Sequence, residues 1–249
     1  MGILFDKILS ESPLVIGHRG APHLAHENTV ESFTHAIDLG VDAIEIDVRR
    51  TVDGVLVIHH DDTIMNHSEK ISGLTYAQVL RGSKKEGFSV PTLMETLELC
   101  RDRTCLDIEL KESGYELEVY TQVKEHFELR NVLFNSFIDE SVLKLTEIDN
   151  CIEVGLLLGA PPSASFPVRF SELFPFKRIC VCKAKFVSTH WKLLRFGFLK
   201  RMKRTEIPVL VWTVDDIRRV TRLAKQNVEG IITNIPDKVI QALSDNTSV

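Results

Sequence analysis

Short apolar runs, most of them rich in β-branched residues, alternate with longer segments of helical periodicity along the 249-residue chain. The runs predict strands at LVIG, DAIEIDV, VLVIHH, CLDIEL, VLFNSF, EVGLLL, RICVC, VLVWTV and EGIITN. Alternation of this kind is typical of βαβ units that build a parallel sheet in an α/β fold. About eight such units favour a closed (β/α)8 barrel of the TIM type over an open doubly wound sheet. With 44% hydrophobic residues, we expect one barrel domain over residues 1–249.

Several predicted helices carry recognisable end signals. The helix within TVESFTHAIDLG should end before Gly40, which stands where a left-handed residue often follows a helix. Thr92 and Glu95 in VPTLMETLELC form a capping box. Asp139 and Asp215 are expected to cap the helices in DESVLKLTEI and VDDIRRVTRLAKQ.

Residues 61–89 interrupt the alternation. This segment is polar and contains several glycines, and it shows one short helical stretch at 76–80. We expect a short insertion that follows the VLVIHH strand and lies on the rim where barrel enzymes carry their active sites.

Two predicted strands carry charges where a buried parallel strand should be apolar. Because side chains alternate along a strand, each strand gathers its charges on one face: Glu45, Asp47 and Arg49 on the first, and Asp107, Glu109 and Lys111 on the second. One interpretation is the solvated face of an antiparallel or edge strand. The alternative is a buried charged site, in which a cation offsets the repulsion between carboxylates.

Histidines at other strand ends favour the buried site. His18 ends one run, and His59 and His60 end another. Barrel active sites are built from residues at the carboxyl ends of several strands. Carboxylate oxygens suit Mg²⁺ or Ca²⁺ better than Zn²⁺, so the sequence predicts one divalent cation of that kind.

The order of these motifs resembles that of a known enzyme family. HRG, HENT, E-x-D, HD and IELK, followed by VWTVDD and GIITNIPDKV, are similar to the motifs of the glycerophosphodiester phosphodiesterase family. The resemblance covers nearly the whole chain. It implies a TIM-type barrel and a metal-dependent phosphoric diester hydrolase. Such an enzyme converts small glycerophosphodiesters to glycerol 3-phosphate and an alcohol.

The resemblance also implies roles for individual side chains. The implied metal ligands are Glu45, Asp47 and Glu109. His18 and His60 would form the acid–base pair, because two histidines can donate and accept protons near neutral pH. Which of them is the acid stays open, as does the nucleophile: water, or a glycerol hydroxyl that would first give a cyclic phosphate.

Substrate contacts follow from the same resemblance. Arg19 would bind the phosphate, with Lys111 beside it, unless Lys111 is a solvated residue at a strand end. Glu27 and Asn28 of HENT would lie near the metal and the phosphate. Trp212 would lie near the glycerol, unless it only fills the barrel.

Three positions depart from the family pattern. His26 replaces a proline before Glu27, Val52 replaces a basic residue, and Asn234 stands where an aspartate is usual. None of them is an implied ligand or catalytic histidine. We therefore expect them to affect loop geometry and substrate preference.

Three neighbours of the motifs have a simpler interpretation. His59 and His60 should face opposite ways on a strand, so His59 is expected to be structural. Asp61 should orient the loop after His60. Asp107 is expected to form hydrogen bonds inside the barrel.

Charge and targeting signals limit the partners. A net charge of -5 and the lack of a basic arm argue against nucleic acid. The segment 190–204 is basic and apolar, which indicates an outer helix with a solvated face or, alternatively, a weak membrane-surface contact. We see no signal peptide and no apolar run that would span a bilayer, so a cytoplasmic location is expected. The five cysteines fit no zinc framework, and the oligomeric state stays open.

Two other functions remain open. One is a lysophospholipid-directed phospholipase D on the same barrel, for which a long apolar channel would speak. The other is a phosphodiester-binding protein with weakened catalysis, against which the intact set of carboxylates and histidines argues.

Overall fold

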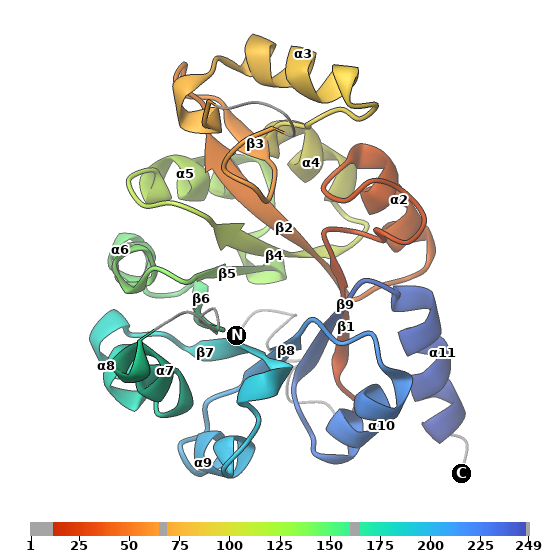
Figure 1. Ribbon diagram of the computed structural model, residues 1–249, viewed down its shortest axis with the longest axis vertical. Helices are drawn as coiled ribbons and strands as arrows, with labels where there is room; N and C mark the ends of the chain where they lie inside the picture. Colours follow the sequence, from red (N-terminus) through yellow and green to blue (C-terminus); the bar gives the residue numbers. More distant parts are fainter. Residues whose placement is uncertain (1–11, 65–68, 160–164, 248–249) are drawn as a thin grey trace.

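Eight parallel strands close into a barrel (Figure 1). They are β1 (Leu14–His18), β2 (Ala43–Arg50), β4 (Cys105–Leu110), β5 (Val132–Ser136), β6 (Glu153–Leu158), β7 (Phe186–His190), β8 (Val209–Trp212) and β9 (Gly230–Thr233). The ring closes because β1 pairs with both β2 and β9. The computed structural model describes residues 12–64, 69–159 and 165–247. The predicted (β/α)8 barrel is confirmed.

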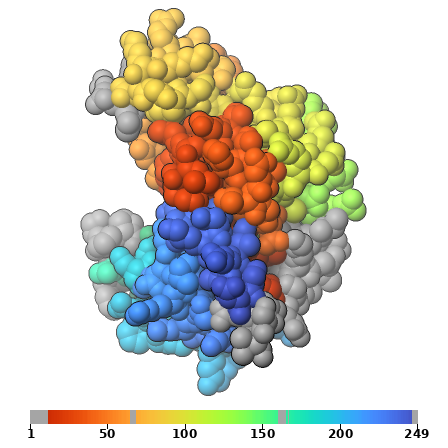
Figure 2. All heavy atoms as spheres, turned by 90° about the vertical axis from the view of Figure 1, so that its right-hand side faces the viewer, coloured from red at the N-terminus to blue at the C-terminus, as the bar shows by residue number. Residues whose placement is uncertain are grey.

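Helices follow the strands and surround the barrel. They are α2 (Val30–Asp38), α4 (Leu93–Cys100), α5 (Glu116–His126), α6 (Asp139–Ile148), α8 (Phe176–Cys182), α9 (Phe198–Arg204), α10 (Ile217–Lys225) and α11 (Pro236–Thr247). Figure 2 shows α2 directly above α11, as expected when the first and last βα units of a barrel meet. None of the helices in the described ranges has the length and apolarity needed to cross a bilayer.

The alternation along the strands divides the core into two parts. One cluster fills the interior of the barrel and contains Leu14, Ile16, Ala43, Leu133, Phe186, Leu210 and Ile232. The larger cluster lies between strands and helices and includes Val15, Ile44 and Ile46. Since Ala43 faces the interior, Glu45 and Asp47 must face it too. The fold therefore places the acidic face of β2 inside the barrel.

The helix-end predictions are partly correct. Thr92 and Glu95 form the expected capping box on α4, and Gly40 follows α2 with φ of 78°. The predicted caps at Asp139 and Asp215 are wrong. Asp139 is the first residue of α6 itself, and Asp216 rather than its neighbour caps α10.

One strand was assigned wrongly and another was missed. RICVC forms the end of α8 rather than a strand, since a short run of apolar residues fits either structure. The barrel strand is β7, whose sequence FVSTH carries Ser188 and Thr189 fully buried in the sheet. Because these positions are polar, the segment lacks the apolar run by which the other strands were predicted.

The VLVIHH run was expected to form a barrel strand, but it does not belong to the parallel barrel. It forms the short β3 (Leu56–Ile58), which pairs antiparallel with the outer end of β2. The insertion follows it and contains the 3₁₀ helix η1 (Ile71–Gly73) and α3 (Tyr76–Lys85), which is longer than the predicted stretch at 76–80. Figure 2 shows this insertion standing above α2. Residues 65–68 of the predicted insertion, and the N-terminal residues 1–11, lie outside the described ranges.

Candidate active site

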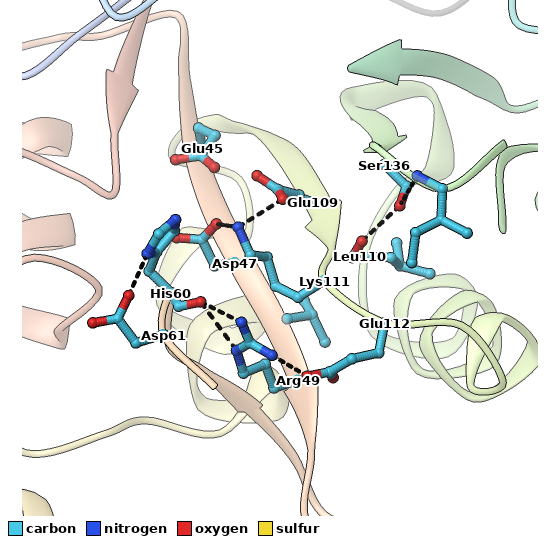
Figure 3. Close-up of polar contacts among 12 residues, drawn as sticks. Glu45, Asp47, Arg49, His60, Asp61, Glu109, Leu110, Lys111, Glu112 and Ser136 are labelled. Atoms are coloured by element: carbon cyan, nitrogen blue, oxygen red, sulfur yellow. Dashed lines mark hydrogen bonds and ion pairs between the residues drawn. The ribbon is translucent and has the colours of Figure 1, made fainter. Parts of the chain in front are cut away.

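Three carboxylates meet inside the barrel at the carboxyl ends of β2 and β4 (Figure 3). In the parallel register, Asp47 lies opposite Glu109 and Glu45 lies opposite Asp107. One oxygen from each of Glu45, Asp47 and Glu109 lies within 4.8 Å of the others, and all three residues are buried. Period-two alternation on adjacent strands therefore produces the cluster directly.

Two cationic side chains neutralise part of this charge. The Lys111 Nζ lies 2.7 Å from Glu109 Oε1 and 3.2 Å from Asp47 Oδ1. The Arg19 Nε lies 3.2 Å from Asp47 Oδ2, and its backbone N–H donates to Glu45 Oε2 at 3.0 Å. Arg19 also pairs with Glu27 at 2.6 Å.

The loop that carries Arg19 and Asn28 has an unusual backbone. Both residues have φ near +55°, a region that side chains other than Gly rarely adopt. Gly20 makes the turn at Arg19 feasible, because a Cβ at Gly20 would lie 2.4 Å from Ser32 Oγ. Backbone conformations of this kind often occur at functional sites. Here the turn directs Asn28 Nδ2 to donate to Asp47 Oδ2 at 2.7 Å.

The pKa values follow from burial and from these pairs. Burial, and then the neighbouring Asp47, raises the pKa of Glu109 to about 7 and raises that of Glu45 well above its ordinary value. Burial also acts to raise the pKa of Asp47, but the Lys111 and Arg19 charges hold it below its usual range. The cluster would thus bind protons at neutral pH unless more positive charge compensates it.

The residues present fit a divalent cation. The donors are all carboxylate oxygens, as Mg²⁺ and Ca²⁺ prefer. Asn28 Oδ1 is buried and has no hydrogen-bond partner among the described residues, and Asp47 Oδ1 is buried with the Lys111 ion pair at 3.2 Å as its contact. An added cation would offset the carboxylate charge that Lys111 and Arg19 leave uncompensated.

His18, at the end of β1, is held in one orientation by a chain of hydrogen bonds. Its Nδ1 lies 2.7 Å from Asn234 Oδ1. Asn234 Nδ2 and its backbone N–H both donate to Asp215, at 2.8 Å each. Because a carboxylate only accepts, Asp215 fixes the amide so that its oxygen faces His18, and His18 Nδ1 must be the donor. The lone pair of the neutral ring is then on Nε2.

His60 has a different partner. Its Nδ1 lies 2.8 Å from Asp61 Oδ1, and its backbone carbonyl accepts from Arg49 Nε at 3.0 Å. Arg49 in turn pairs with Glu112 (Figure 3). The sequence placed Arg49 beside the carboxylates, but the position of Arg49 as a support for the His60 loop was not predicted. Burial, and then the Lys111 charge, lowers the pKa of His60.

These groups surround a cavity of about 120 Å³. Seven of the predicted site residues line it: His18, Arg19, Glu45, His60, Glu109, Lys111 and Trp212. Asp47 and Asn28 are not among the lining residues, but Asp47 contacts Arg19 and Lys111, which are, and Asn28 donates to Asp47. One wall is apolar and consists of Phe137, Leu157, Trp212 and Ile232, of which only Trp212 was predicted. Phe137 ends the NSF motif, so its position after β5 was the available signal.

The neighbouring residues lie outside the cavity lining. His59 is buried, and its Nε2 contacts the Thr63 carbonyl at 3.3 Å. Asp107 lies deeper in the barrel and accepts a hydrogen bond from Asn135, and burial raises its pKa to about 8. His26 stacks on Phe88 of the insertion, with ring centroids 3.9 Å apart. The stack replaces the rigidity that a proline would give this turn.

A parallel barrel whose strand ends gather carboxylates, histidines and cations has the arrangement of a barrel enzyme that acts on an anionic substrate. The model of the glycerophosphoryl diester phosphodiesterase family matches residues 18–238. The chain therefore belongs to this family of phosphoric diester hydrolases.

Individual relatives cover the chain almost completely. A glycerophosphodiester phosphodiesterase of Caldanaerobacter subterraneus subsp. tengcongensis is 29% identical over 91% of this chain and 96% of its own. A crystal structure of a putative glycerophosphoryl diester phosphodiesterase from Silicibacter pomeroyi has a TM-score of 0.85 at 22% identity, covering 99% of each chain. An Oleispira antarctica phosphodiesterase, solved with the product sn-glycerol-3-phosphate, has a TM-score of 0.80 at 25% identity, covering 95% of this chain and 99% of that one.

Proposed function

We propose that this chain hydrolyses glycerophosphodiesters to glycerol 3-phosphate and an alcohol, with one Mg²⁺ or Ca²⁺ held by Glu45, Asp47 and Glu109. The observation that carries the proposal is the small cavity lined by Glu45, Glu109, Arg19, Lys111, His18 and His60, with Asp47 in contact with Arg19 and Lys111. The product-bound relative from Oleispira antarctica supports the same product class.

The cationic side chains bind and orient the phosphate. A bound cation would supply positive charge next to the phosphoryl oxygens. Lys111, which lines the cavity beside Asp47 and Glu109, would add a second positive charge there. Arg19 then offers its guanidinium to two phosphate oxygens, while its backbone N–H keeps Glu45 in place. Negative charge develops on the phosphoryl oxygens in the transition state, and the Arg19 and Lys111 donors are already oriented to stabilise it.

The histidines differ in the partners that support them. The amide of Asn234 leaves His18 neutral, with a free lone pair on Nε2, so His18 accepts the proton of the attacking hydroxyl. The carboxylate of Asp61 stabilises a protonated ring better than an amide does, so His60 donates the proton to the leaving alcohol. The attacking hydroxyl belongs to water or to the substrate glycerol. Detection of a cyclic glycerol phosphate would distinguish them.

The apolar wall gives the glycerol carbons a contact surface. Trp212 Nε1 is buried without a hydrogen-bond partner among the described residues, which leaves it available to a substrate oxygen. Phe137 extends the wall into solvent, with 39% of its surface exposed, and this favours a lysophospholipid as the second candidate substrate. The small cavity volume favours the shorter diesters.

The test is turnover of glycerophosphoethanolamine by three histidine variants. His18→Ala and His60→Ala should each lower kcat by about 10²–10⁴-fold, the usual contribution of a positioned acid or base. His126→Ala, at the end of α5 and outside the cavity, is the matched control and should keep full activity. Turnover of either site variant near that of the control would refute the assignment.

A further inference from the structure

An additional helix follows β6, the strand whose carboxyl end borders the cavity. α7 (Phe166–Leu173) precedes α8, and α8 is the helix that packs beside α6 around the barrel (Figure 1). The end of β6 borders the cavity, because a Cβ at Gly159 would lie 2.6 Å from the Trp212 ring. The loop from β7 to α9 leaves its strand at the same end. α7 and this loop therefore belong to the rim around the candidate active site.

Arg201 of α9 joins these two elements into one surface. Its Nη2 donates to the Leu173 carbonyl at 2.8 Å, and its guanidinium lies 4.4 Å above the Phe174 ring. Its Nη1 donates to the Phe196 carbonyl. The end of α7 and the tip of the β7–α9 loop are thus held side by side.

This surface exposes large apolar side chains. Phe196 is 78% exposed and Phe170 is 53% exposed, and Val168 and Phe174 are also exposed. The Phe170 and Phe174 rings stack with centroids 4.7 Å apart. Large exposed apolar side chains gathered on segments that are joined in this way are typical of an interaction site.

The same part of the chain concentrates positive charge. Residues 166–205 contain eleven of the 30 lysines and arginines but one of the 35 acidic residues. That acidic residue, Glu172, is buried and pairs with Arg178 at 2.7 Å. The rest of the chain is strongly acidic, since the total charge is -5. Four exposed cations lie on the same segments and form no ion pair within the described ranges: Arg169 of α7, Lys177 of α8, Arg195 before α9 and Lys200 of α9.

We propose that this surface binds the face of an anionic phospholipid bilayer and directs the barrel mouth toward it. We call it the α7–α9 face, made of Val168, Phe170, Phe174 and Phe196 with Arg169, Lys177, Arg195 and Lys200. Apolar tips enter the interface while lysine and arginine contact the lipid phosphates. A second copy of the chain would bring like charges together. Nucleic acid would use the cations and leave the apolar tips in water.

The binding test is co-sedimentation of the full chain with vesicles. At low salt the protein should bind phosphatidylcholine vesicles that contain phosphatidylglycerol, and it should remain free with phosphatidylcholine alone. The double variant Phe170→Ser with Phe196→Ser should lose about tenfold in partitioning, since each ring loses part of its transfer free energy. Arg195→Glu with Lys200→Glu should lose a similar factor.

The matched control is Leu117→Ser. Leu117 is 62% exposed on α5, between Glu116 and Glu118, and its replacement should leave vesicle binding unchanged. Absence of binding to the anionic vesicles would overturn the proposal. So would an equal loss in the control, or binding to soluble heparin that is as strong as vesicle binding and insensitive to Phe196→Ser. Turnover of water-soluble glycerophosphoethanolamine, measured in parallel, tests the proposed function separately.

Discussion

Exchanging the residues at positions 215 and 234 would change the charge next to His18 while keeping the hydrogen bond that links them. The double variant Asp215→Asn with Asn234→Asp retains one amide and one carboxylate, which contact each other at 2.8 Å in the structure. It places the carboxylate against His18 Nδ1, where the amide oxygen now lies at 2.7 Å. The single variant Asn234→Asp instead brings two carboxylates together and should destabilise the protein near neutral pH.

The expected magnitude follows from the pKa of His18. Burial, and then the Arg19 charge, lowers this pKa from 6.5 to about 4. Between these two pH values, His18 binds a proton in the unfolded chain but stays neutral in the folded protein. Stability is fully present above pH 6.5 and falls as the pH drops toward 4, by about 3 kcal/mol for a difference of about 2.5 pKa units. A carboxylate partner should raise the folded pKa by about 1–3 units and remove much of this loss.

Two assays would measure the effect. Imidazole NMR titration of the metal-free protein gives the pKa of His18 directly, and the acidic limb of the kcat/KM profile should move to higher pH by the same amount. Urea unfolding at pH 7 and pH 5 should show a smaller pH dependence for the double variant than for the natural sequence. If the double variant folds but both the acidic limb of its kcat/KM profile and the pKa of His18 are unchanged, the hydrogen-bond chain through Asn234 does not set the pKa of His18.

Three further predictions concern the cation and the substrate. Because the pKa of Glu109 is raised to about 7, cation binding must release protons, and calorimetry should show affinity rising from pH 6 to pH 8; affinity independent of pH would contradict this. Asn28→Ala removes the donor that orients Asp47 and should weaken cation binding by about 10–100-fold, together with a loss of thermal stability because alanine is strained at the φ of 55° that Asn28 adopts. Trp212→Phe keeps the ring but loses the free Nε1 donor, so KM should rise several-fold while kcat stays nearly constant; an unchanged KM would remove Trp212 from substrate binding.

The acidic cluster could be predicted because it depends on local rules. Alternation alone places Glu45 and Asp47 on one face of β2, and the parallel register then brings Glu109 opposite Asp47. The strand-end position of His18 follows in the same way. These features need only the period of a strand and the arrangement of a parallel sheet.

Other features depend on contacts that a single sequence does not reveal. Asp215 was assigned to a helix cap, but its side chain reaches Asn234 across adjacent units of the barrel. The RICVC run is as apolar as a strand, and the polar β7 was missed for the opposite reason. The basic segment 190–204 indicated a surface role, but its junction with α7 through Arg201 needed the fold.

The most direct test of the central claim is glycerol 3-phosphate release from glycerophosphoethanolamine after chelation and after restoring Mg²⁺ or Ca²⁺. We predict that chelation abolishes release, that one of the two cations restores it, and that Asp47→Asn prevents the restoration while the protein stays folded. Release that continues at the same rate in chelator, or full restoration in Asp47→Asn, would contradict the assignment of the acidic cluster as the metal site of this enzyme.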